Sequence, residues 1–304
     1  MDIFDSNIDI NKYKVFLAVA EFSSFSKAAE YLHISQPAIS HSIKELEDQL
    51  NTKLFIRNNK NVILTDDGEK IKYYIRSAFN TISLGEKKLK EDDSDLNGVI
   101  RIGMYTHISV FMLPDIISDF KKMYPKSKFS IYATSNVEML EKLRNNDLDF
   151  VVLQYPIFTN EKNIKEEVVC KLETCFYSGE KYYDLYSTKQ KKISEIPIIL
   201  PTRGFPDINK LEETLKNNNI LITHDFTCYN TSLSKSLVKN DLGIGWGLKK
   251  CIEKELENNE LYEIKVDFDM PLSIFSIAYD EKIINKTTKE FIKLFKEKMK
   301  EISK

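Results

Sequence analysis

Residues 24–50 read SFSKAAEYLHISQPAISHSIKELEDQL and contain two helical patterns joined by a tight turn. The first helix is expected over residues 25–32, with Ser24 as its N-cap. Ser35 can cap the second helix, and Pro37 falls in its first turn, where the missing N–H costs nothing. A short helix, a tight turn and a longer helix form the helix-turn-helix arrangement, whose second helix enters the major groove of DNA.

The second of these helices has two chemically different faces. Apolar residues recur at spacings of four, three and four, which is typical of a buried face: Ile39, Ile43, Leu46 and Leu50. The opposite face is polar and carries Gln36, Ser40, His41 and Lys44. An earlier periodicity predicts a helix over residues 10–20, with Ile10 on its buried face and Asp9 as N-cap. Alternating apolar residues around a polar tip predict a two-stranded wing over residues 53–65.

The charge of this segment weakens the DNA-binding hypothesis. Residues 1–65 hold seven basic and eight acidic residues, whereas most nucleic-acid-binding domains are more basic. Three-helix units also serve as protein-contact domains, so that alternative stays open. However, three of the acids lie in the leading segment, and acids on the helices can occupy the face away from DNA.

Residues 13–68 resemble the winged helix-turn-helix of LysR-type transcriptional regulators, most specifically in the run Ser35-Gln-Pro-Ala-Ile-Ser40. The resemblance implies a set of base and phosphate contacts, to which Lys44 is added from the polar helix face: Ser26, Lys27, Gln36, Pro37, Ser40, His41, Lys44 and Arg57. The chain departs from the family pattern at His41 and Glu45, where many relatives have arginine. Because a histidine makes one pH-sensitive contact and an arginine forks onto guanine, the operator preference should not be transferred from those relatives.

A long helix is expected after the wing, with Thr65 as N-cap and two acidic residues in its positive first turn. Its apolar residues are spaced like the a and d positions of a coiled coil and predict a dimerisation helix: Ile71, Ile75, Ala78, Ile82 and Leu89. The alternative is that this stripe packs against the chain's own body. A two-fold dimer would read an interrupted palindrome. The acidic run 91–95 is expected to end the helix and to act as a hinge.

From residue 97 strands and helices alternate, which predicts open sheets with helices on their faces. Strands are expected at 99–104, 127–133, 148–153, 168–177, 198–200, 222–229, 243–246, 262–266 and 272–279, and helices at 109–123, 137–145, 207–216, 232–239, 249–257 and 287–302. The family resemblance continues here in order, for example at Leu113-Pro114 and Leu242-Gly-Ile-Gly245. It implies an effector domain similar to type II periplasmic binding proteins, with two lobes and the ligand in the cleft.

The expected domains are a winged helix-turn-helix over residues 1–65, a linker helix over 66–95 and an α/β effector domain over 96–304. Within the effector domain, lobe 1 is expected at about 96–156 and 270–304, and lobe 2 at about 157–269. The two crossovers between the lobes are placed near residues 154–162 and 266–271.

Ligands of such sheets bind where strands end and helices begin. The candidate effector contacts are Thr106, His107, Ser135, Asn136, Thr202, Arg203, Asn230 and Thr231. Hydroxyl donors at helix N-termini, together with one arginine, suit a small anion such as a carboxylate. Helix capping explains Ser135 and Asn136 equally well, a surface ion pair is the alternative for Arg203, and His107 can be an ordinary loop residue.

Composition sets further bounds. A chain of 304 residues with 42% hydrophobic and 30% charged residues predicts two or three folded domains. Its first ten residues, MDIFDSNIDI, do not form a signal peptide, no apolar run approaches a membrane span, and four cysteines without a CxxC pair favour a reducing cytoplasm. No cofactor or metal is expected, because Gly243-x-Gly-x-Gly247 lacks the spacing of a dinucleotide loop and no HExxH or Walker motif occurs.

These observations predict a ligand-responsive transcriptional regulator and no enzyme. Its expected partners are double-stranded DNA with an interrupted palindrome, a small, anionic effector, and further copies of itself in a dimer or tetramer; the resemblance also allows contact with RNA polymerase. The effector would shift the oligomer conformation and thereby its operator contacts. A solute-binding protein and an enzyme are the alternatives. The missing signal peptide and the first 95 residues disfavour the former, and the lack of catalytic motifs disfavours the latter.

Overall fold

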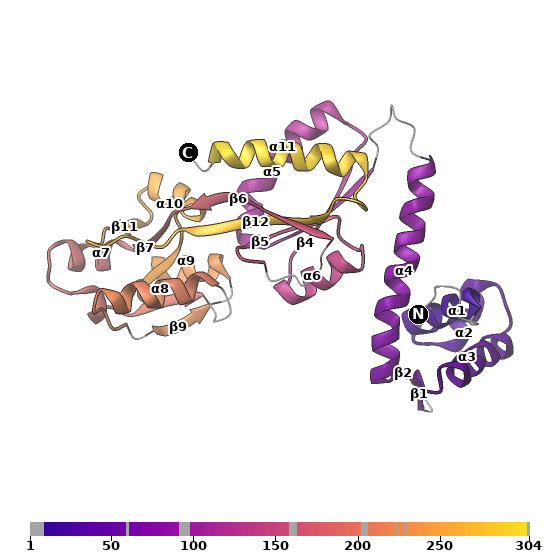
Figure 1. The fold of residues 1–304 in the computed structure, drawn as a ribbon. Helices are drawn as coiled ribbons and strands as arrows, with labels where there is room; N and C mark the ends of the chain where they lie inside the picture. The colour runs from indigo at the N-terminus through magenta and orange to yellow at the C-terminus, as the bar shows by residue number, and fades with distance from the viewer. Residues whose placement is uncertain are drawn as a thin grey trace. The chain divides into compact units, whose positions relative to one another are not determined.

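The computed structural model describes residues 9–58, 61–90, 98–157, 163–201, 206–222, 224–228 and 230–302. The chain divides into two units: the first comprises residues 1–91 and 144–147, and the second comprises residues 92–143 and 148–304. The first unit is helical with a small hairpin, and the second is an α/β unit with two sheets (Figure 1).

The first unit contains the predicted helix-turn-helix and wing. The helices are α1 (Ile10–Phe22), α2 (Phe25–Leu32) and α3 (Gln36–Leu50), followed by the antiparallel strands β1 (Phe55–Asn58) and β2 (Asn61–Leu64). All three predicted N-caps are confirmed: the side chains of Asp9, Ser24 and Ser35 accept hydrogen bonds from the backbone N–H groups of Asn11, Lys27 and Ala38. His33 adopts a left-handed φ of 54° and ends α2, which produces the tight turn before α3.

The helices enclose a small core that includes Phe16, Ile39, Ile43 and Leu46, all fully buried. Leu50 packs against this core in a half-buried position. The expectation that Ile10 is buried was wrong, because its side chain is 51% exposed. Ile10 is the first residue of α1, and the apolar packing of this helix begins only at Tyr13.

The helix α4 (Asp66–Lys90) follows the wing, and Thr65 Oγ1 caps it by accepting from the backbone N–H of Gly68 at 2.9 Å. Ile75 is buried in the core of the winged helix-turn-helix, and Ile71 packs against the same core. For Ile71 and Ile75, the alternative therefore holds that the apolar face of this helix packs against the same chain. Ile82 is 46% and Leu89 is 89% exposed, so the distal part of the stripe faces outward within this chain.

The first sheet of the α/β unit has the order β4-β3-β5-β12-β6. Its strands are β3 (Val99–Met104), β4 (Lys128–Tyr132), β5 (Phe150–Gln154), β6 (Ile164–Leu172) and β12 (Ser273–Asp280). β3 runs parallel to β4 and β5, and β12 runs antiparallel to β5 and β6. The helices α5 (Thr106–Met123) and α11 (Lys286–Ile302) lie over one face and α6 (Asn136–Arg144) lies at the other (Figure 1).

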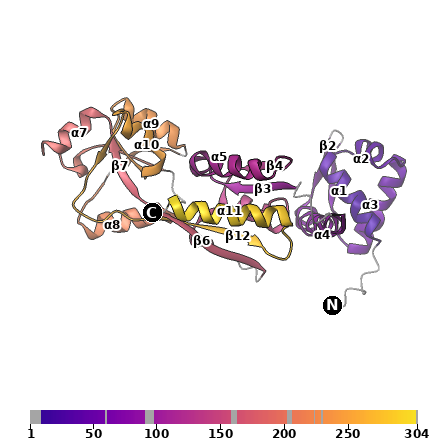
Figure 2. The same cartoon turned by 90° about the horizontal axis from the view of Figure 1, so that it is seen from above.

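The second sheet has the order β11-β7-β10-β8-β9. Its strands are β7 (Thr174–Ser178), β8 (Ile198–Pro201), β9 (His224–Cys228), β10 (Ile244–Leu248) and β11 (Tyr262–Ile264). The α-helices α7 (Glu180–Ser187) and α8 (Pro206–Asn217) share an apolar cluster with one face, and α9 (Thr231–Lys239) and α10 (Glu253–Glu257) share one with the other (Figure 2). Two short 3₁₀ turns complete this lobe, η1 (Ile193–Glu195) and η2 (Lys249–Cys251).

The first predicted crossover is in the wrong place. β6 pairs with β12 in the first sheet, so the chain passes to the second sheet at Glu173 and not near residues 154–162. The single strand expected over 168–177 is accordingly two strands, β6 and β7, separated by Glu173. The second passage lies between β11 and β12 and includes the predicted residues 266–271.

Smaller corrections concern the helices. α5 begins at Thr106, three residues earlier than expected, and the helix expected over 249–257 is divided into η2 and α10. α7 was not predicted. The acidic run 91–95 lies outside the described residues. No helix in the described part of the chain is sufficiently long and apolar to cross a membrane.

Candidate DNA-binding surface and effector cleft

The polar face of α3 is available at the surface of the first unit. Gln36, Pro37, His41 and Lys44 are exposed, and Ser40 is half-buried. Their positions follow from the buried stripe on the opposite face of the helix and from the Ser35 cap at its start. Ser26 and Lys27 are exposed in the first turn of α2, and Arg57 is the third residue of β1, where its backbone pairs with Val62. The predicted DNA contacts therefore come from the start of α2, the length of α3 and the wing.

Glu45, which stands where many relatives have arginine, is held in an ionic network. Its carboxylate lies 3.1 Å from Lys12 Nζ of α1 and 3.4 Å from His41 Nε2, one helical turn away. The hydrogen bond and positive charge of Lys12 lower the pKa of Glu45 below its usual value. The cation on α1 thus offsets part of the negative charge that α3 would otherwise present beside His41.

Glu47 is a structural residue whose role was not predicted from the sequence. It is buried, and its Oε1 accepts hydrogen bonds from the backbone N–H groups of Leu54 at 2.9 Å and Phe55 at 3.3 Å. Its Oε2 accepts from Lys53 Nζ at 2.7 Å. Burial alone would raise the pKa of Glu47. The three hydrogen bonds together lower it by more than burial raises it, so the pKa lies below its usual value. One carboxylate therefore fixes the wing to the helix expected to read DNA.

The α/β unit contains two adjoining hollows between its lobes. The inner cavity has a volume of about 70 Å³ and is lined by residues of both lobes, among them Gln154, Asp207 and Trp246. The outer hollow has a volume of about 230 Å³ and lies against the N-termini of α5 and α9. His107, Asn230 and Thr231 line both. A space of this size exceeds the roughly 10–15 Å³ that one water needs, so a small molecule can enter.

The structure brings four of the eight predicted effector residues to these hollows: Thr106, His107, Asn230 and Thr231. Ser135 and Asn136 do not line them. Ser135 Oγ accepts from the backbone N–H of Glu138 at 3.3 Å, which is the capping alternative, and Asn136 Oδ1 accepts from the hydroxyl of Tyr105. Thr202 and Arg203 lie outside the described residues.

Two of the four also have a structural role. Asn230 caps α9, because its Oδ1 accepts from the backbone N–H groups of Ser232 at 2.7 Å and Leu233 at 3.3 Å. His107 is in the first turn of α5 and not in a loop. Burial lowers the pKa of His107 to about 4, so the imidazole is neutral at physiological pH.

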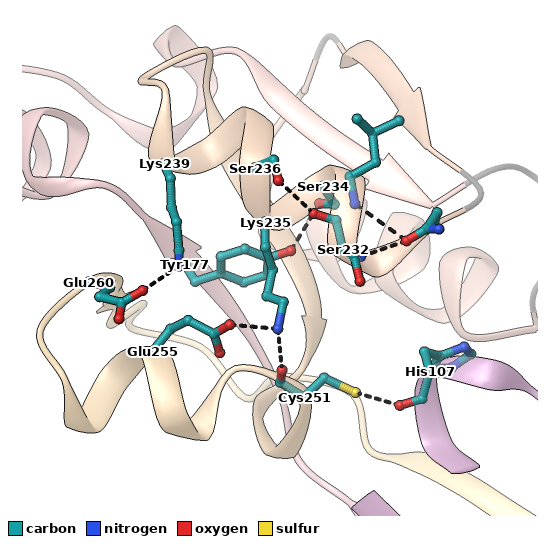
Figure 3. A network of polar contacts seen from close by, with 12 residues as sticks. His107, Tyr177, Ser232, Ser234, Lys235, Ser236, Lys239, Cys251, Glu255 and Glu260 are labelled. Carbon is teal, nitrogen blue, oxygen red and sulfur yellow. Dashed lines mark hydrogen bonds and ion pairs between the residues drawn. The ribbon is translucent and has the colours of Figure 1, made fainter. Parts of the chain in front are cut away.

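Several polar residues of the inner cavity were not predicted. Tyr177 and Ser234 form a buried hydrogen bond of 2.9 Å between their hydroxyl oxygens (Figure 3). Asp207 Oδ2 accepts from Gln154 Nε2 and from Ser273 Oγ. Burial raises the pKa of Asp207, although its hydrogen bonds and the charge of Lys210 act in the opposite direction. A glutamine at the end of the otherwise apolar strand FVVLQ was the one signal in the sequence that could have indicated this site.

Four hydrogen bonds between described residues join the lobes around the inner cavity. Asp207 of α8 receives its hydrogen bonds from β5 and β12 of the other lobe. Cys251 Sγ of η2 donates to the backbone carbonyl of His107 at 3.3 Å (Figure 3). Thr174 Oγ1 donates to the carbonyl of Pro271 at 2.6 Å, at the second passage between the lobes. A ligand in the cavity would therefore contact the groups that connect the lobes.

The lining of the cavity has the chemistry of a small-molecule pocket. Within the described ranges, no cluster of three or more His, Cys, Asp or Glu side chains could hold a metal ion. Burial raises the pKa of the Cys251 thiol to about 12, which keeps it protonated and unreactive. The other residues that line the cavity are hydrogen-bonding side chains and apolar side chains, as in pockets for small molecules.

A winged helix-turn-helix in the same chain as a two-lobed α/β unit with an interlobe cavity defines the class of ligand-responsive DNA-binding regulators. Residues 10–69 match the family model of the bacterial regulatory helix-turn-helix protein, lysR family, and residues 93–300 match the model of the LysR substrate binding domain. The chain therefore belongs to the LysR family. It is a LysR-type transcriptional regulator with an effector-binding domain, and not an enzyme.

Similar proteins agree with this assignment. YvbU of Bacillus subtilis (strain 168), an uncharacterised HTH-type transcriptional regulator, is 29% identical over 236 residues, 77% of this chain and 80% of that protein. The RuBisCO operon transcriptional regulator of Allochromatium vinosum is 24% identical over 270 residues, 86% of each chain. A full-length OxyR variant from Pseudomonas aeruginosa shares the fold, with a TM-score of 0.68 at 18% identity over 97% of this chain and 95% of that one.

Proposed function

We propose that this regulator binds an interrupted palindrome as a homodimer or homotetramer in the cytoplasm, and that a small anionic effector in the interlobe cleft changes its operator contacts. The observation that carries the proposal is the pair of adjoining hollows, in which polar residues of both lobes meet. A molecule bound there contacts the groups that join the lobes. It can therefore favour one arrangement of the lobes over another, in proportion to its difference in affinity for the two.

Two features of the outer hollow favour a carboxylate. The first turn of α5 lies there and has no side-chain cap, so the positive end of an 18-residue helix faces the hollow. Thr106, Thr231 and Ser232 supply hydroxyl groups that can donate to an anion, whereas the Thr134 hydroxyl already donates to Glu138 at 2.6 Å. Arg203, which was expected to add a positive charge, lies outside the described residues.

The proposed DNA contacts are those of the predicted set: Ser26, Lys27, Gln36, Pro37, Ser40, His41, Lys44 and Arg57. Their support is the exposure of the polar face of α3 together with the position of the wing. The distal residues of α4, namely Ala78, Ile82 and Leu89, are the proposed dimer contacts, because they are apolar and exposed within one chain. Contact with RNA polymerase would follow from the same regulatory role.

A test of the effector site uses Thr106→Val with Thr231→Val. The double variant removes two hydroxyl donors and keeps the side-chain shape, so carboxylate binding should weaken about tenfold, as expected for two lost hydrogen bonds. A panel of small mono- and dicarboxylates is screened by thermal shift, and the best binder is titrated by calorimetry. Thr214→Val on α8, which lines neither hollow, is the matched control. If no carboxylate binds, or if all variants bind it equally, the anionic effector site is refuted.

A further inference from the structure

The inner cavity contains three buried polar atoms that have no hydrogen-bond partner among the described residues. They are Gln154 Oε1, Asp207 Oδ1 and Trp246 Nε1. The three residues line the cavity and are only 6%, 5% and 4% exposed. Because buried polar groups in native proteins are nearly always hydrogen-bonded, three such atoms around one cavity indicate an occupant that completes them.

The neighbouring contacts determine which of these atoms accept hydrogen bonds. Gln154 must direct its amide nitrogen at Asp207 Oδ2, because its oxygen would repel a carboxylate there. Its oxygen is therefore left as an acceptor. Asp207 Oδ1 is also an acceptor, and Lys210 Nζ at 3.6 Å is too distant for a hydrogen bond and is 37% exposed to solvent. The indole Nε1 of Trp246 can only donate.

The occupant must therefore offer several donors and a positive charge on one side and an acceptor on another. Asp207 is the only Asp, Glu, Lys or Arg among the described residues that line the cavity, and its ion-pair partner Lys210, with Nζ 3.6 Å from Oδ1, lies outside this lining. A second carboxylate would be repelled by the carboxylate of Asp207. An ammonium group has three donors and the complementary charge, and it can serve Asp207 Oδ1 and Gln154 Oε1 together.

We propose that the effector bears a protonated amine, which enters the inner cavity and donates to Asp207 and Gln154, while an oxygen of the same molecule accepts from Trp246. This inference rests on the proposed effector function of the cleft. Because His107, Asn230 and Thr231 line both hollows, the amine in the inner cavity and the carboxylate in the outer one belong to one molecule. The ligand class is thus a small aminocarboxylate.

The binding residue itself supplies the assay. Trp246 is the one tryptophan in the sequence, so indole fluorescence of the full-length protein reports on this cavity directly. The probes are the standard L-amino acids and short ω-aminocarboxylates, each paired with the analogue in which a hydroxyl replaces the amine. At least one amine should bind at least tenfold more tightly than its hydroxyl analogue, because only the amine pairs with the buried carboxylate.

Two substitutions separate recognition from folding. Asp207→Asn keeps the shape and an acceptor for Gln154 and Ser273, and it should weaken binding of the amine about 30-fold or more while leaving the hydroxyl analogue within about threefold. Lys210→Gln removes the cation that competes for Asp207 and should tighten amine binding about threefold. Asp119→Asn, in the surface ion pair of α5 with Lys122, is the matched control and should have no effect.

The outcomes distinguish this inference from the function on which it rests. One outcome is that carboxylates without an amine bind and change operator affinity, while Asp207→Asn alters the binding of neither the carboxylates nor the amines. In that case the amine site is refuted and the effector cleft stands. If no amine of the panel changes Trp246 fluorescence or binds by calorimetry, the inference is also overturned, and the three atoms are satisfied by water. If neither series binds, the effector cleft itself is wrong.

Discussion

At the scale of single residues, the surface of α3 differs from the arginine-rich pattern of many relatives. His41 pairs with Glu45, and Glu45 is paired in turn with Lys12, so the charge near the middle of the helix is largely balanced inside the protein. We therefore propose that cations outside this network contribute to affinity, such as Arg57 on the wing. We also propose that sequence recognition depends on polar side chains at the start of the helix, first among them Gln36.

This division of roles predicts different effects for two alanine variants. Arg57→Ala should weaken binding to all duplexes, by about 1 kcal/mol for a lost phosphate contact, and should make the salt dependence less steep. Gln36→Ala should mainly relax sequence preference, with a loss of about 1–3 kcal/mol on the operator and little loss on a scrambled duplex. Both are measured by fluorescence anisotropy over a salt series. The assigned roles would be contradicted if both variants lost the same binding free energy on the operator as on the scrambled duplex.

The residue scale also shows where sequence reasoning succeeded and where it could not. The caps Asp9, Ser24, Ser35 and Thr65 were predictable because each depends on a local contact with a neighbour at most three residues away. The polar contacts of Asp207 were not, because Gln154, Asp207 and Ser273 meet only through the fold. Likewise Ser135 was selected as a ligand contact, whereas its local capping bond is the contact that the structure records.

At the scale of elements, one buried carboxylate joins α3 to the wing. Replacing Glu47 with alanine leaves the N–H groups of Leu54 and Phe55 without their acceptor in a buried position. We expect the free energy of unfolding of the first unit to fall by about 2 kcal/mol, as is typical when buried donors lose their partner. Urea denaturation followed by circular dichroism measures this change. Glu30→Ala on the exposed side of α2 is the control, and equal stability of the two variants would refute the role of Glu47.

A second link between elements predicts a pH dependence. Glu167 of β6 accepts hydrogen bonds from Lys296 Nζ of α11 at 2.6 Å and from the Tyr279 hydroxyl of β12 at 2.8 Å. Partial burial raises the pKa of Glu167, but hydrogen bonds from Lys296, Tyr279 and Lys165 outweigh it and lower the pKa to about 2. Because the folded pKa is depressed, this stabilisation is present above the ordinary value of 4.5 and is lost as the pH falls towards 2.

Glu167→Gln should therefore be less stable than the unmodified chain at pH 7, and the difference should shrink at pH 3. The side chain is 35% exposed, so solvent screening limits the effect to about 1 kcal/mol at pH 7. Urea denaturation at the two pH values measures it, with Glu297→Gln on the exposed side of α11 as the control. A difference that stays constant from pH 7 to pH 3 would show that the ionised carboxylate contributes nothing.

Element boundaries show why the passage between lobes was misplaced. The run from Val168 to Tyr177 is mostly apolar, and local periodicity cannot reveal that its two halves belong to different sheets. Pairing of β6 with β12, more than 100 residues later in the chain, decides the assignment. The helix-turn-helix, in contrast, depends on contacts within 40 residues and was predicted almost to the residue.

At the scale of the whole molecule, the chain combines a DNA-binding unit with a unit that can hold a small molecule. The regulator function follows from the family, and the composition alone would not have revealed it, since the net charge of −2 gives no general attraction to DNA. We therefore propose that binding depends on a local arrangement of α2, α3 and the wing, repeated on a second copy of the chain.

The most direct test of this account is the binding of the full-length protein to DNA, measured by fluorescence anisotropy over a salt series. The probes are the intergenic duplex upstream of the gene and a scrambled duplex of the same composition. We predict a preference of more than tenfold for the native duplex at physiological salt, and a steady loss of affinity as salt rises. Equal binding to both duplexes, or no binding to any genomic fragment even with pooled metabolites, would contradict the account.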